Sequence, residues 1–74
     1  MNAPQITAML FDTAWASCVL TLTSGQQIRV THPDYLLMPK HRAWVMYVPD
    51  EQILQLIPVE HIASIQIRRR LKAA

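Results

Sequence analysis

Residues 43–48 constrain the fold more than any other stretch, because apolar side chains fill a short, strand-like run on both faces. Successive side chains of a strand point to opposite faces, so Trp44, Met46 and Val48 would share one face. Val45 and Tyr47 would lie on the other face. A strand that is apolar on both faces is central in its sheet, or a helix or a neighbouring subunit covers it. A chain of 74 residues is near the lower size limit for a single core, and such domains often pair with another copy.

The register of the first predicted hairpin, residues 16–31, follows from its apolar alternation. A two-residue loop would place the apolar residues of the first strand on the polar face of the second strand. A three-residue loop over residues 23–25 pairs Leu20 with Ile28 and gathers the apolar side chains on one face. It also places Gly25 in the left-handed position of a type I turn with a G1 bulge, which favours glycine. We therefore predict the three-residue loop.

The remaining pattern predicts one short helix and several short strands. Asn2 can cap a helix over residues 3–11. Pro33 ends the ladder of the second strand, and residues 58–61 are expected to form a 3₁₀ corner. Five strands are expected, over residues 16–22, 26–31, 43–48, 52–57 and 63–67.

This order of elements predicts an all-β fold with a short N-terminal helix. A helix followed by five short strands, with one long bend and one corner, is typical of a small, strongly bent antiparallel barrel of the SH3/Sm-like type. We assign residues 1–67 to a single barrel domain and residues 68–74 to a basic C-terminal tail.

Basic charge gathers in this tail. The formal net charge is +2, and the tail holds four of the seven basic residues: Arg68, Arg69, Arg70 and Lys72. The rest of the chain has three basic residues against five acidic ones, a net charge of −2, so the domain as a whole is not expected to bind polyanions. The tail could contact nucleic-acid phosphates, or it could be a solvated terminus that keeps a sheet edge unpaired.

The turn after the second predicted strand holds the candidate binding residues His32, Asp34 and Tyr35. A histidine and an aspartate can together form a general base, but no nucleophile is adjacent, so we interpret them as turn-forming residues. Tyr35 and Trp15 are the candidates for exposed aromatic side chains that could stack on a partner. No catalytic residue is predicted.

No metal site and no cofactor are expected. The spacing of His32, His41 and His61 matches no standard ligand pattern, and no glycine-rich phosphate loop is present. Cys18 lies in an apolar run, which predicts a small buried side chain. We find no secretory signal and no apolar run near the roughly 18 residues of a membrane span. The expected location is therefore cytoplasmic, without a membrane partner.

Residues 25–36, 45–49 and 59–65 resemble a functionally uncharacterised group of small bacterial proteins. In that group a glycine-containing hairpin leads into a Val-x-His-Pro-Asp-Phe/Tyr motif, and the chain ends in a His-Ile-x-x-Ile strand. The resemblance covers about residues 6–67 and implies a fold more than an activity.

More distantly, the order of elements is similar to that of Sm-like RNA-binding proteins. Their bacterial members carry a histidine in the corner before a short last strand, as His61 does here. The resemblance implies ring assembly and RNA binding. The chain departs from it at Glu60, where those members carry a lysine, which reverses the charge next to an RNA phosphate.

These observations lead to a non-enzymatic interaction module that associates with itself or with a protein partner through strand edges and aromatic residues. The alternative is a barrel that binds RNA or DNA through the basic tail together with Tyr35 or Trp15. A third interpretation, an enzyme or small-molecule binder that uses His32 and Asp34, requires a concave pocket beside His32.

Overall fold

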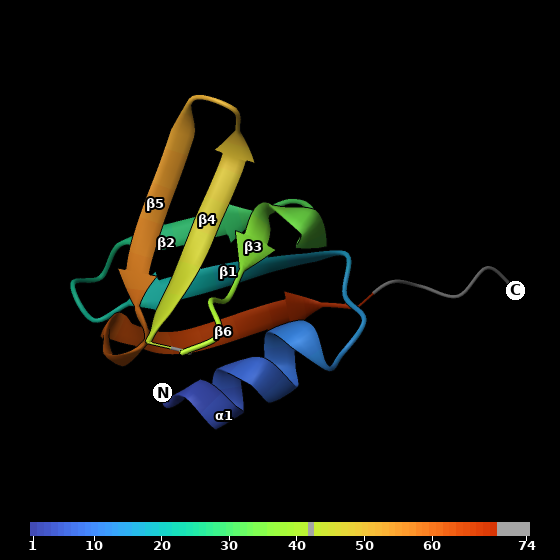
Figure 1. Ribbon diagram of the computed structural model, residues 1–74. Helices are drawn as coiled ribbons and strands as arrows, with labels where there is room; N and C mark the ends of the chain where they lie inside the picture. Colours follow the sequence, from blue (N-terminus) through green and yellow to red (C-terminus); the bar gives the residue numbers. More distant parts are fainter. Residues whose placement is uncertain (42, 70–74) are drawn as a thin grey trace, which may run out of the picture.

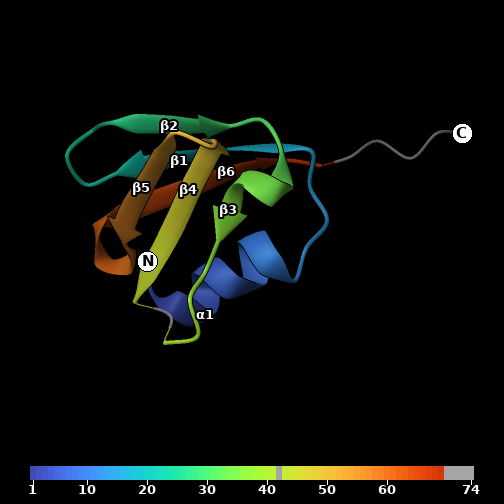
Figure 2. The same ribbon diagram turned by 45° about the horizontal axis from the view of Figure 1, so that its top comes forward.

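The computed structural model describes residues 1–41 and 43–69 (Figure 1). The first sheet has the strand order β2 (Gln27–Val30), β1 (Ser17–Leu22) and β6 (Ile62–Arg68). The second sheet has the order β3 (Leu36–Leu37), β4 (Trp44–Asp50) and β5 (Ile53–Pro58). The helical elements are α1 (Ala3–Ile6), its π-helical continuation η1 (Thr7–Phe11), and the 3₁₀ turns η2 (Pro33–Tyr35) and η3 (Val59–His61). The strands of the two sheets cross steeply, with the N-terminal helix beside β6 (Figures 1 and 2).

The fold is mostly β with a short N-terminal helix, as predicted, but it is not the closed five-stranded barrel that the sequence suggested. The described residues form six strands, and their ladders stay within two separate sheets. Pro33 lacks an N–H group and opens η2, so β2 ends at Val30 and does not bend onward into the second sheet. The unpredicted strand is β3, where Leu36 pairs with Tyr47. Two residues are too few to show an alternating pattern.

The predicted register of the first hairpin is confirmed. Leu20 pairs with Ile28. The loop is closed by two hydrogen bonds, in which Leu22 N donates to Gln26 O at 2.8 Å and Gly25 N donates to Leu22 O at 2.9 Å. Gly25 has φ +93°, the left-handed conformation that the three-residue loop requires.

The N-terminal helix is held by its cap and by two buried side chains. Asn2, the predicted cap, accepts at Oδ1 from Gln5 N at 3.0 Å, and Gln5 Oε1 accepts from Asn2 N at 3.1 Å, so the two residues form a capping box. Ile6 and Leu10 lie one turn apart and are both buried. A helix this short is not stable alone in water, so this apolar contact with the sheets is what stabilises it.

The core lies between the two sheets. Its buried members are Ile6, Leu10, Trp15, Cys18, Leu20, Ile28, Val30, Leu36, Val45, Ile57, Val59 and Ile62. No polar or charged side chain is buried among the residues that the structure describes. Each sheet therefore has one face in the core, and the sheets differ in what their outer faces carry.

Candidate interaction surface

The outer face of the second sheet is apolar and open to solvent. Leu37 pairs with Met46, and Met46 pairs with Leu56, so the three lie in one row across β3, β4 and β5. Leu37 is 53% exposed and Leu56 is 49% exposed. Trp44 and Leu54, at alternate positions of β4 and β5, continue the same face and are 38% and 57% exposed. We call these five residues the apolar sheet face.

Alternation along β4 and β5 separates the apolar sheet face from the core. Val45 pairs with Ile57, and both side chains are buried. Their chain neighbours Trp44, Met46 and Leu56 therefore point away from the core. Single exposed apolar residues are ordinary on protein surfaces, but a contiguous group of five is typical of an interaction site.

The hairpin of β4 and β5 extends past the first sheet in the view of Figure 1. At its tip, Asp50 Oδ1 accepts from Gln52 N at 2.7 Å and from Ile53 N at 3.1 Å, which orders the turn. Ile53, the first residue of β5, lies on the opposite face to Leu54 but is also 51% exposed. The tip is therefore apolar on both faces and acidic at its end.

The predicted site residues His32, Asp34 and Tyr35 lie together in the turn after β2. His32 Nδ1 accepts a hydrogen bond from Asp34 N at 3.2 Å and caps η2. The rings of His32 and Tyr35 are tilted, with centroids 5.6 Å apart. Asp34 Oδ2 is 3.6 Å from the same Nδ1, and this contact is an ion pair only when the imidazole is protonated. Because the Nδ1 lone pair accepts a backbone N–H, this nitrogen does not act as a general base in this arrangement.

The prediction that Trp15 belongs to an exposed binding surface is wrong. Its side chain is 2% exposed, and its indole Nε1 donates to Leu10 O at 2.8 Å. A large ring between the end of the helix and β1 fills the core there, and the hydrogen bond satisfies its one polar atom. Tyr35 is half-buried against the same core.

The basic residues near the C-terminus do not all lie in a tail, because one of them belongs to β6. Arg68, assigned to the tail from the sequence, is the last residue of β6 and pairs with Ser17. Its carbonyl oxygen accepts from Ala16 N at 2.8 Å, so Arg68 belongs to the sheet. Arg69 follows it and is exposed. The other two predicted contacts, Arg70 and Lys72, lie outside the described residues.

The remaining candidates for site chemistry do not converge on one place. Over residues 1–41 and 43–69, the structure contains no group of three or more His, Cys, Asp or Glu side chains that could hold a metal ion. Cys18 is buried, as predicted, and burial raises the pKa of its thiol to about 11. A thiol with that pKa stays protonated at neutral pH and is a poor nucleophile.

Comparisons of the chain with protein-family models, with curated proteins and with solved structures found no match. The resemblance to small bacterial proteins and to Sm-like proteins therefore stays a prediction. None of the helices in the described part of the chain has the length and apolar character needed to cross a membrane.

The sequence prediction missed the leucines of the apolar sheet face: Leu37, Leu54 and Leu56. A signal for two of them was present, because residues 53–57 are apolar at four of five positions and so on both faces of a strand. β5 has a neighbour on one side only in the second sheet. A strand that is apolar on both faces at the edge of a two-layered fold leaves one face in water.

Proposed function

We propose that this chain is a non-enzymatic interaction module and that two copies associate through the apolar sheet face. The observation that carries the proposal is the row of Leu37, Met46 and Leu56 across all three strands of the second sheet. Monomeric proteins rarely leave so continuous an apolar strip in water.

The exposed apolar area suits a weak, reversible dimer. Full burial of a leucine-sized side chain contributes about 1.5–3 kcal/mol, so a half-exposed one can contribute about 1 kcal/mol more. The five residues on each of two copies therefore supply on the order of 10 kcal/mol, against an association cost of roughly 4–15 kcal/mol. At the lower end of this association cost the balance is about −6 kcal/mol, which corresponds to a dissociation constant of roughly 40 µM, and a higher cost gives a weaker dimer.

The charges at the two ends of β4 favour a second copy as the partner. Asp50 and Glu51 are exposed at the hairpin tip, and Lys40 is exposed in the segment that precedes β4. If two copies meet about a two-fold axis with their β4 strands antiparallel, the acidic tip of each lies near the lysine of the other. A parallel arrangement would bring like charges together.

We also propose that the fold is of the SH3/Sm-like class and that the protein is cytoplasmic. The helix, the strands and the 3₁₀ corner η3 before the last strand follow the order of SH3-like and Sm-like proteins, which supports an open, two-sheet variant of that class. The unpaired, buried thiol of Cys18 supports a reducing, cytoplasmic location.

Sedimentation velocity over a concentration series, from about 5 to 500 µM, tests the association. The unmodified protein is expected to change from monomer to dimer within the series. Leu56→Lys places an ammonium group in the row and should keep the protein monomeric, because a charge would have to be buried without a partner. Ser64→Lys adds the same charge at an exposed position of β6 and should leave the dimer intact.

Two results would contradict the proposal, provided that circular dichroism shows both variants folded. The first is an unmodified protein that stays monomeric throughout, which would mean that no second copy binds. The second is a dimer that Leu56→Lys leaves unchanged, which would place the contact elsewhere. A charge exchange tests the antiparallel arrangement: Glu51→Lys should weaken the dimer, and adding Lys40→Glu should restore it.

A further inference from the structure

The outer face of the first sheet has the opposite character to the apolar sheet face. Leu20 and its partners Ile28 and Ile65 point toward the core, so Val19 and Thr21 point outward with their own partners. The outward side chains of the three strands are Ser17, Val19, Thr21, Gln27, Arg29, Ser64, Gln66 and Arg68. All of them except Val19 are polar or cationic.

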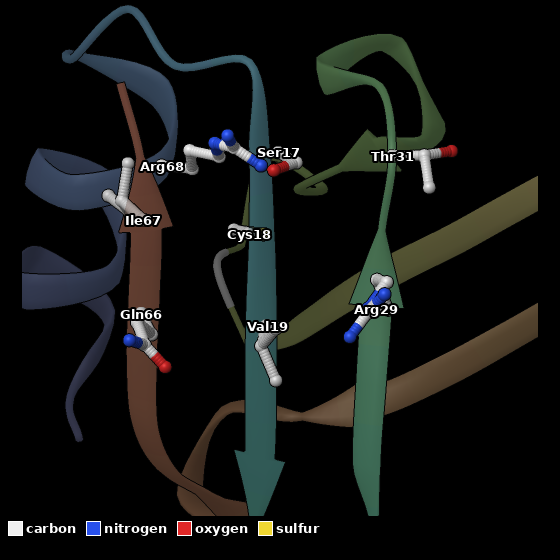
Figure 3. Close-up of a pocket in the computed structure, with 8 residues that line it drawn as sticks. All are labelled: Ser17, Cys18, Val19, Arg29, Thr31, Gln66, Ile67 and Arg68. Carbon is white, nitrogen blue, oxygen red and sulfur yellow. The ribbon is translucent and has the colours of Figure 1, made fainter. Parts of the chain in front are cut away.

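An open groove of about 600 Å³ crosses this face (Figure 3). The side chains that line it from outside the core are Ser17 and Val19 on β1, Arg29 and Thr31 on the β2 side, and Gln66 and Arg68 on β6. The side chain of Arg68 extends from β6 toward Ser17, so the cationic group lies by the central strand (Figure 3).

The groove is cationic, and none of the described residues that line it carries a carboxylate side chain. The acidic residues of the chain all lie in turns or at the ends of elements, and none lies in β1, β2 or β6: Asp12, Asp34, Asp50, Glu51 and Glu60. Asp34 is three residues after Thr31, which lines the groove, and its carboxylate lies beside His32. The strands that form this face therefore contribute cationic side chains to it and no anionic ones.

The spacing of the two arginines suits a chain of phosphates. Arg29 pairs with Val19, Val19 pairs with Gln66, and Arg68 lies two residues beyond Gln66. With strands about 4.8 Å apart and about 3.3 Å per residue along each strand, the two arginine Cα atoms are about 12 Å apart. The flexible side chains that extend from these two positions can reach different phosphates of one single strand that crosses the face. Ser17, the partner of Arg68 on β1, and Gln66, two residues before Arg68 on β6, line the same groove, and their hydroxyl and amide groups can donate to backbone oxygens.

We propose that this groove binds the phosphodiester backbone of a single-stranded nucleic acid, with Arg29 and Arg68 contacting different phosphates of the strand. Among residues 1–41 and 43–69, those that line the groove include no aromatic ring on which a base could stack, so recognition is expected to depend little on base sequence. The proposal goes beyond self-association and is independent of it. The groove lies on the opposite sheet, and a dimer formed through the apolar sheet face leaves both grooves open.

Fluorescence anisotropy with labelled oligouridine and oligothymidine of about 12 nucleotides tests the groove, because single-strand binding sites have this order of length. Measurements between about 50 and 200 mM salt give the salt slope, to which each neutralised phosphate contributes about 0.7. Arg29→Gln and Arg68→Gln should each weaken binding several-fold and lower the slope by about that amount. Lys40→Gln removes the same charge outside the groove and should change neither. Leu56→Lys, which prevents dimer formation, should bind as the unmodified protein does.

Three results would overturn the proposal. One is an equal loss of affinity in Lys40→Gln and Arg29→Gln, which would reflect net charge alone. Another is a loss of binding when residues 70–74 are removed, with no effect of Arg29→Gln, which would assign the binding to the tail. The third is displacement of the oligonucleotide by polyglutamate at equal charge concentration, which would show that the groove does not select phosphates.

Discussion

Ile57 and Leu56 are neighbours in β5, and their replacement by alanine should have very different consequences. Ile57 is 1% exposed in the core, whereas Leu56 is 49% exposed on the apolar sheet face. Both substitutions remove three carbon atoms from an aliphatic side chain of the same strand. Any large difference between them therefore reports which face each residue occupies.

The expected magnitudes follow from this difference in burial. Truncating a buried isoleucine to alanine costs about 2–5 kcal/mol, because transfer free energy is lost and a cavity remains. In a domain of this size, a loss of 1 kcal/mol lowers the melting temperature by about 4–8 °C. Ile57→Ala should therefore lower it by roughly 8–40 °C. Leu56→Ala should cost less than about 1 kcal/mol, since half of the side chain is already in water.

Urea unfolding, followed by tryptophan fluorescence at a protein concentration below dimer formation, measures both values. The buried indole of Trp15 moves into water on unfolding and supplies the signal. The reasoning is refuted if Leu56→Ala costs as much as Ile57→Ala in the monomer, because the two faces would then be equally buried. At high protein concentration, Leu56→Ala should weaken the dimer. Ile57→Ala should instead lower the free energy of unfolding of each copy.

Three further predictions concern the core and the first hairpin. Trp15→Phe removes the donor to Leu10 O and should cost about 1–3 kcal/mol in urea unfolding, because a buried carbonyl loses its partner; an unchanged stability would show that the ring is not in the core. Burial raises the pKa of Cys18 from 9.0 to about 11, so stability should fall as the pH rises from 9 to 11, where only the unfolded thiol ionises. Cys18→Ala should remove that part of the pH dependence, and a persistent fall would assign it to other groups. Gly25→Ala forces a positive φ on alanine and should cost about 1 kcal/mol, whereas Ser24→Ala in the same loop should be nearly neutral in thermal unfolding.

Local patterns in the sequence were sufficient to predict the first hairpin. The alternation of its apolar residues allows one pairing that buries them together, and a glycine at the required turn position selects the same pairing. Leu20 and Ile28 accordingly face each other as predicted. The capping box at Asn2 is another local feature, and it too is present.

Features that depend on how the sheets meet could not be predicted from the sequence. Whether strands close into a barrel depends on the twist and spacing of both sheets, and no residue pattern reports these quantities directly. The position of Trp15 before a strand indicates neither burial nor exposure, so the sequence does not show that its ring lies in the core. Both faces of residues 53–57 are apolar, so their pattern does not show that Leu56 faces water while Ile57 faces the core.

The groove residues Arg29 and Arg68 are 39 positions apart in the chain, and only the pairing of β1 with both β2 and β6 brings them to one face. From the sequence, Arg68 belongs to a basic run and Arg29 is an isolated charge in a strand. Strand pairing is a long-range property, so this part of the candidate binding surface required the structure.

The most direct measurement of the central claim is an NMR concentration series, in which backbone amide shifts of the ¹⁵N-labelled protein are followed as the protein is diluted. The apolar sheet face predicts concentration-dependent shifts at residues 36–37 and 44–57, with little change at residues 17–22. Shifts that appear instead in the first sheet, or a spectrum that does not change with concentration, would contradict association through this face.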